Sequence, residues 1–75
     1  MIDSTLKKIL SEVFTQSSVC IDDSIDTIDE WDSMLHMELI IALEKSYSIR
    51  VEPEDIVMLT SVKSIQDYLN SKGLL

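Results

Sequence analysis

The segment from residue 33 to residue 46 constrains the fold most, because it carries apolar side chains on two sides of a predicted helix. At about 100° per residue, the two groups are Leu39, Ile40, Leu43 and Tyr47 on one side and Met34, Met37 and Ile41 nearly opposite. A chain of 75 residues is too short to surround a helix completely. We therefore predict that the first group lies in the core and that the second group, named the methionine stripe, is exposed.

Three other segments have helical character. Apolar residues at helical spacing predict a helix over about 4–16. Pro53 suits the first position of a short helix that runs through about Met58. Thr60 and Ser61 are then expected to cap a last helix. The sequence therefore predicts an all-α fold, a small bundle of three main helices plus one short helix.

The connection over residues 17–32 is long and rich in Ser, Asp and Thr. Its apolar β-branched residues are Val19, Ile21, Ile25 and Ile28. They predict that this loop between the first two main helices is held against the bundle, so that residues 1–75 form a single domain. Trp31 is expected to anchor the loop, and Cys20 is expected to be partly buried within it.

Charge and cysteine content exclude several classes of protein. The 14 acidic and 6 basic residues give a net charge of −8, which disfavours nucleic acids and anionic membrane surfaces as partners. The single cysteine cannot form an internal disulfide, and no Cys/His cluster predicts a metal site. No apolar run approaches the roughly 18 residues of a membrane-spanning helix, so membrane insertion is not expected and a cytoplasmic location is the simplest reading.

The acidic loop gives way to the predicted helix at Asp32 and Ser33. Both are good N-cap residues, so the helix is expected to start at one of them and to run to about Ser46. No general base stands beside Ser33, and His36 falls toward the core side, where we expect it to hydrogen bond to the loop. The Ser33 hydroxyl is therefore expected to be modified by another protein, and the chain is not expected to be an enzyme.

A resemblance to the acyl and peptidyl carrier protein family rests on Asp32-Ser33-Met34 and on the following Glu38-Leu39-Ile40-Ile41-Ala42-Leu43-Glu44. The signature of that family is Asp-Ser-Leu followed by a helix of the form xxxELxxALE. The similarity continues through Tyr47-Ser48-Ile49-Arg50-Val51, where the family usually has an aromatic residue, a glycine and an isoleucine, and into the last predicted helix. It therefore covers nearly the whole chain. The variant with Trp31 before the Asp-Ser pair looks less like the housekeeping fatty-acid carrier and more like the discrete, stand-alone carriers of specialised pathways or like peptidyl-type carriers.

The resemblance implies a carrier function. A separate phosphopantetheinyl transferase is expected to attach 4′-phosphopantetheine from coenzyme A to Ser33. The thiol at the end of this arm then holds an acyl or aminoacyl group as a thioester. The implied further partners are enzymes that load and transfer acyl or aminoacyl groups in fatty acid, polyketide or nonribosomal peptide biosynthesis. The protein itself is expected to be a monomer.

Partner recognition is expected to use the methionine stripe and neighbouring carboxylates. The predicted recognition residues are Asp32, Met34, Met37, Glu38, Ile41 and Glu44. Exposed apolar side chains bordered by charges are typical of transient interfaces, and methionine adapts to several partners. The alternative hypothesis is a non-enzymatic acidic adaptor that docks one protein permanently through the same stripe. Neither hypothesis requires catalytic residues or metal ligands.

Overall fold

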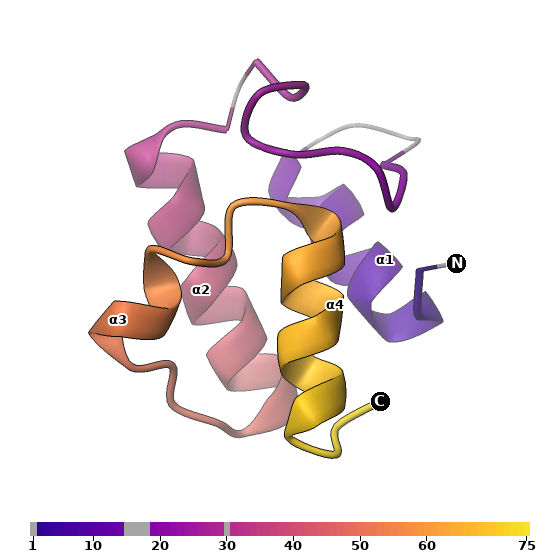
Figure 1. Cartoon of the computed structure of the whole chain (residues 1–75), viewed down its shortest axis with the longest axis vertical. Helices are drawn as coiled ribbons and strands as arrows, with labels where there is room; N and C mark the ends of the chain where they lie inside the picture. Colours follow the sequence, from indigo (N-terminus) through magenta and orange to yellow (C-terminus); the bar gives the residue numbers. More distant parts are fainter. Residues whose placement is uncertain (1, 15–18, 30) are drawn as a thin grey trace.

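The computed structural model of the protein describes residues 2–14, 19–29 and 31–75. Within these ranges the chain forms the helices α1 (Ser4–Phe14), α2 (Ser33–Tyr47), α3 (Pro53–Ile56) and α4 (Val62–Ser71). Figure 1 shows α3 as a short helix beside α2, and the loop before α2 at the end of the bundle where α2 begins. The prediction of a helical bundle with three main helices and one short helix is confirmed.

The helix boundaries follow local sequence signals. α2 begins at Ser33, as predicted, and ends at Tyr47, one residue beyond the expected end. α3 ends at Ile56 instead of Met58, because the chain turns there toward the buried Leu59. The last two residues of the predicted first helix lie outside the described residues.

The N-terminus of α4 is closed by two serines. The Ser61 hydroxyl accepts from the backbone N–H of Ser64 at 3.0 Å, and the Ser64 hydroxyl accepts from the backbone N–H of Ser61 at 3.1 Å. This reciprocal arrangement is a capping box. It confirms that the residues before Val62 cap the last helix.

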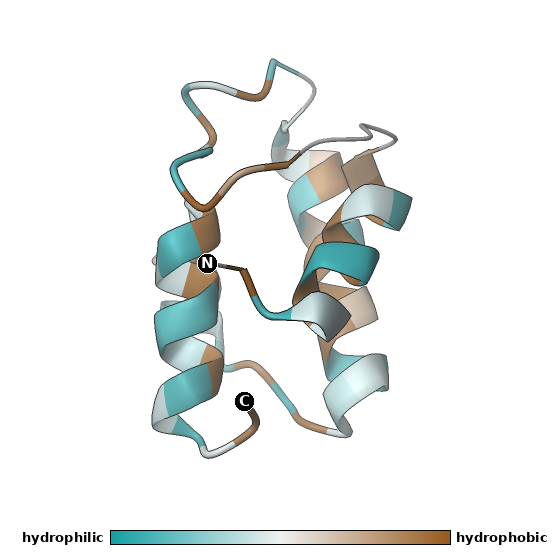
Figure 2. Ribbon diagram, turned by 90° about the vertical axis from the view of Figure 1, so that its right-hand side faces the viewer, coloured by the Kyte–Doolittle hydropathy of each residue, from teal (hydrophilic) through white to brown (hydrophobic). Residues whose placement is uncertain are grey.

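Each main helix contributes one apolar side to a common core. The fully or nearly fully buried helical residues are Leu6, Ile9, Leu10 and Phe14 from α1, Leu39, Ile40 and Leu43 from α2, and Val62, Ile65 and Leu69 from α4. Figure 2 shows the hydrophobic residues of α4 on the side that faces the other helices. Burying one such aliphatic side chain contributes about 1.5–3 kcal/mol, so this core is the main source of stability.

The loop before α2 is attached to α4 by its backbone. The N–H of Ile25 donates to the carbonyl oxygen of Thr60 at 2.9 Å, and the N–H of Val62 donates to the carbonyl oxygen of Asp23 at 3.0 Å. Val19 and Ile28 are buried in the common core. The prediction that the loop is held against the bundle is therefore confirmed for its described part, residues 19–29 and 31–32.

Two side chains of this loop differ from expectation. Cys20 is exposed, so the prediction of partial burial is wrong. Its backbone N–H donates to the Asp23 carboxylate and its carbonyl oxygen accepts from the Asp23 N–H, which forms a tight turn. Ile25 is also exposed, although it was expected to help hold the loop. There the loop is held by the backbone hydrogen bond and not by the side chain.

α2 ends in a left-handed residue that is not glycine. Ser48 has φ 54° and ψ 46°, and its N–H donates to the carbonyl oxygen of Glu44. A residue with a Cβ atom is disfavoured in this region, whereas glycine is not. Ser48→Gly is therefore expected to raise the free energy of unfolding by about 0.5–1 kcal/mol, as measured by urea denaturation.

The matched control is Ser46→Gly. Ser46 is exposed and lies inside α2, where glycine is a poor helix former. This variant is expected to lose about 0.5 kcal/mol. A loss of stability in both variants would contradict the conclusion that Ser48 has a strained backbone conformation.

Tyr47 packs at the C-terminal end of α2 with its hydroxyl group buried. Among the described residues, none forms a hydrogen bond with this hydroxyl. Burial, together with the negative charge of Asp3, raises the pKa of Tyr47 above its ordinary value. The hydroxyl is therefore protonated at neutral pH.

Candidate functional site

Asp32 fixes the start of α2. Its carboxylate Oδ1 accepts from the N–H of Leu35 at 2.9 Å, and its carbonyl oxygen accepts from the N–H of His36 at 2.8 Å. Asp32 has extended backbone angles, as expected for an N-cap residue. Of the two candidate caps, the cap is therefore Asp32, and Ser33 is the first residue of the helix.

Ser33 is exposed at this first helical position. None of the described residues forms a hydrogen bond with its hydroxyl group. The amide groups of Ser33 and Met34 come before the first amide that the Asp32 side chain satisfies. The hydroxyl is therefore accessible to another protein and lies at the positive end of the helix dipole.

Trp31 joins the loop to the bundle just before this position. Its side chain is only 3% exposed, and its ring packs on Phe14 with the ring centroids 4.9 Å apart. Its indole N–H donates to Nδ1 of His36 at 3.0 Å. Two predictions are therefore confirmed. Trp31 anchors the loop, and His36 forms a hydrogen bond with the loop.

Both ring nitrogens of His36 are engaged. An indole N–H can only donate, so Nδ1 must accept and the neutral ring carries its proton on Nε2. Nε2 lies 2.8 Å from the carbonyl oxygen of Ile56 and donates to it. A histidine held in this way has no free nitrogen with which to activate the Ser33 hydroxyl.

The methionine stripe is exposed. Met34 is 76% exposed, and Met37 and Ile41 are each 46% exposed. Leu39, Ile40 and Leu43, on the opposite side of α2, are buried. The prediction that α2 has one buried and one exposed apolar side is therefore correct. Its role in partner recognition stays a prediction.

The two predicted carboxylates next to the stripe differ from one another. Glu38 is exposed, whereas Glu44 is half-buried. Oε2 of Glu44 accepts from the backbone N–H of Val51 at 2.8 Å. Glu44 therefore has a structural contact that the sequence did not indicate, in addition to its predicted role in recognition.

Two further exposed apolar residues follow α3. Val57 is 71% exposed and Met58 is 70% exposed, and they come directly after Ile56, which contacts α2 through His36. The sequence predicts both residues within the short helix and indicates no role for them. The sequence signal for these exposed residues was the apolar run from Ile56 to Leu59. A helix as short as the predicted one cannot bury all four of these side chains.

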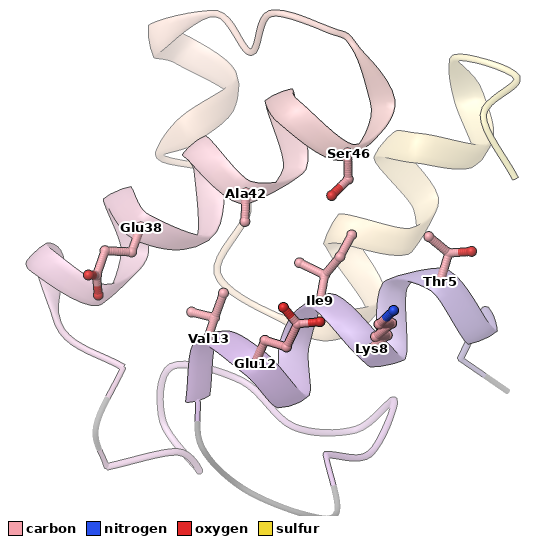
Figure 3. A pocket seen from close by; sticks show the side chains of 8 residues that line it. All are labelled: Thr5, Lys8, Ile9, Glu12, Val13, Glu38, Ala42 and Ser46. Atoms are coloured by element: carbon pink, nitrogen blue, oxygen red, sulfur yellow. The ribbon is translucent and has the colours of Figure 1, made fainter.

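A cavity in the described part of the chain lies elsewhere, between α1 and α2. It has a volume of about 570 Å³ and is lined by Thr5, Lys8, Ile9, Glu12 and Val13 from α1 and by Glu38, Ala42 and Ser46 from α2. Figure 3 shows these side chains on the two facing helices. Ser33 does not line it, and Ala42 lies on the opposite side of α2 from Ser33. The cavity is therefore separate from the hydroxyl group.

The described residues contain no group of three or more His, Cys, Asp or Glu side chains placed to hold a metal ion. In the same part of the chain, no helix has both the length and the apolar character needed to cross a membrane.

Several known proteins are similar to this chain. No family model matches the chain. The acyl carrier protein of Buchnera aphidicola subsp. Schizaphis graminum (strain Sg) is 30% identical over 74 residues, which cover 96% of this chain and 94% of the relative. The similarity therefore extends far beyond the segment around Ser33.

Proposed function

Because the chain belongs to the acyl carrier protein family, we propose that it carries an acyl or aminoacyl group on 4′-phosphopantetheine attached to Ser33. The observation that supports this proposal most strongly is the exposed Ser33 hydroxyl at the first residue of α2, directly after the Asp32 cap. The bound group supplies a terminal thiol that holds the cargo as a thioester. We further propose that the protein works as a cytoplasmic monomer, forms a single domain over residues 1–75, and has no catalytic activity of its own.

The start of α2 suits a phosphodiester. The amides of Ser33 and Met34 can donate to phosphate oxygens, and the helix dipole favours negative charge there. Asp32 uses its carboxylate to accept from Leu35, so this negative group is directed at the helix backbone. These residues would hold the phosphate end of the arm.

The attachment reaction needs a partner enzyme. Oγ of Ser33 forms a bond to the β-phosphorus of coenzyme A, the bond from that phosphorus to the adenosine-bearing phosphate breaks, and the hydroxyl proton leaves to a base. His36 cannot be that base, because both of its nitrogens are engaged. We therefore propose that a phosphopantetheinyl transferase supplies the base and binds the coenzyme.

Cargo loading tests the carrier role. The protein is incubated with a transferase of broad specificity and acetyl-coenzyme A, which delivers the arm with its acyl group. We expect the mass of one acetylated phosphopantetheinyl group on the protein and loss of the acetyl group alone after hydroxylamine treatment, because hydroxylamine cleaves thioesters. A bound acetyl group that resists hydroxylamine would contradict the proposal.

Partner encounter is expected to depend on surface charge. Glu38 is exposed at the border of the methionine stripe, and the chain carries a net charge of −8, so basic partners are attracted to it. Glu38→Lys is expected to lower the association rate with the transferase by several-fold, and the effect should shrink at high salt. Stopped-flow association at two salt concentrations measures it. An unchanged rate at low salt would remove Glu38 from the recognition surface.

The exposed stripe alone also fits the adaptor hypothesis. A permanent adaptor would bind its partner tightly, and Ser33→Ala would not change that binding. A carrier instead releases its partners, and Ser33→Ala abolishes cargo loading. Membership of the acyl carrier protein family favours the carrier.

A further inference from the structure

α3 cannot be held in place by its own structure. It has only four residues, Pro53–Ile56, and none of them is fully buried. Helices this short are unstable in isolation, because nucleation is unfavourable and too few hydrogen bonds form to offset its free energy. The position of α3 must therefore be set by contacts with its neighbours.

Two polar side chains of α2 supply such contacts at the two ends of the segment that contains α3. Glu44 accepts from the N–H of Val51 at 2.8 Å, and His36 donates to the carbonyl oxygen of Ile56 at 2.8 Å. His36 and Glu44 are eight residues apart, or about 12 Å along the helix. The segment 51–56 is thus attached to α2 at both ends, in agreement with the place of α3 beside α2 in Figure 1.

The methionine stripe borders this line of attachment. Met37 and Ile41 are seven and three residues from Glu44, which puts them on the same face of α2. Val57 and Met58 follow directly after the residue that His36 holds, and both are exposed. The same two hydrogen bonds therefore hold the segment that leads into Val57 and Met58 beside α2, the helix that carries the stripe.

We propose that His36 and Glu44 are positioning residues that hold segment 51–56 against α2. They thereby join Val57 and Met58 to the methionine stripe as one recognition surface for the phosphopantetheinyl transferase that acts on Ser33. The inference rests on the proposed function only in its reference to that transferase. Trp31 contributes by fixing the His36 tautomer, since its N–H occupies Nδ1 and leaves the proton on Nε2.

A pair of substitutions at His36 separates its two hydrogen bonds. His36→Asn keeps an oxygen near the place of Nδ1 and can still accept from Trp31, but it does not reach Ile56. His36→Gln places an amide N–H near the place of Nε2 and can still donate to Ile56, but it leaves the Trp31 N–H without its acceptor. Each variant loses one hydrogen bond, so both are expected to lower the melting temperature.

Only His36→Asn should disturb the surface. Amide spectra of the full chain without the arm are expected to show larger shifts at Val57 and Met58 in His36→Asn than in His36→Gln. Hydrogen exchange of the Met58 amide, which donates to Asp55, should be at least about tenfold faster in His36→Asn. Equal shifts of the Val57 and Met58 amides in the two variants, or no shifts in either variant, would overturn the proposal.

Glu44 provides a second pair if His36→Asn does not fold. Glu44→Gln retains an oxygen that can accept from Val51, whereas Glu44→Ala does not. We expect Glu44→Ala to shift the Val51 and Val57 amides more than Glu44→Gln does. The same shifts in both variants would again overturn the proposal.

Transferase kinetics then test the consequence for recognition. His36→Asn is expected to raise KM for the carrier several-fold with kcat nearly unchanged, because the Ser33 end of α2 is intact and only docking is weakened. A fall in kcat with unchanged KM would contradict a positioning role. If wild-type protein is not modified at all, the carrier proposal fails, while the spectra still decide how α3 is held.

Discussion

Trp31→Ala is expected to lower the free energy of unfolding by about 3–5 kcal/mol. The indole is buried, packs on Phe14 and donates to His36, so the substitution leaves a cavity and an unpaired nitrogen at once. Domains of this size have a total stability of about 4–11 kcal/mol at typical values per residue. The variant should therefore be partly unfolded at physiological temperature, as measured by circular dichroism and urea denaturation.

Trp31→Phe is the matched control. It keeps an aromatic ring beside Phe14 but removes the N–H that donates to His36. We expect a smaller loss than in the alanine variant, because most of the packing is retained. If Trp31→Ala cost less than about 1 kcal/mol, a value typical of exposed positions, Trp31 would not anchor the loop.

The two sides of α2 should respond very differently to truncation. Leu43→Ala removes a fully buried side chain and is expected to cost about 2–5 kcal/mol. Ile41→Ala removes a side chain that is 46% exposed, and it should cost less than about 1 kcal/mol. Thermal and urea denaturation of both variants give the comparison. Similar losses would mean that the stripe belongs to the core.

Binding to the transferase should instead depend on the exposed side of α2. Ile41→Ala is expected to weaken the docked complex with the transferase while the fold stays intact, because exposed apolar side chains contribute to the centre of transient interfaces. Titration of the folded variant against the transferase measures this effect. Unchanged affinity in Ile41→Ala and in Met37→Ala would remove the stripe from the interface.

The sequence was sufficient to predict those features of the fold and the site that depend on local interactions. The start of α2 depends on Asp32, whose side chain reaches an amide three residues ahead. The two apolar sides of α2 follow from helical spacing in a chain too short to cover both. The role of Trp31 could be predicted because a large apolar residue in a polar loop has few alternatives to burial.

Contacts that depend on how the chain returns to α2 could not be predicted. Glu44 has the spacing of a surface carboxylate, but the left-handed turn at Ser48 brings Val51 beside it. The contact of His36 with Ile56 likewise joins residues that are 20 positions apart. Cys20 was placed wrongly for a related reason, since its orientation depends on a hydrogen-bonded turn with Asp23.

The mass of the intact protein after reaction with coenzyme A and a phosphopantetheinyl transferase tests the central claim most directly. We predict a gain of one phosphopantetheinyl group in the wild type and in Ser46→Gly, and no gain in Ser33→Ala. Fragmentation of the peptide that contains residues 31–37 should place the group on Ser33. No gain in the folded wild-type protein, or a gain that persists in Ser33→Ala, would contradict the claim that Ser33 carries the arm.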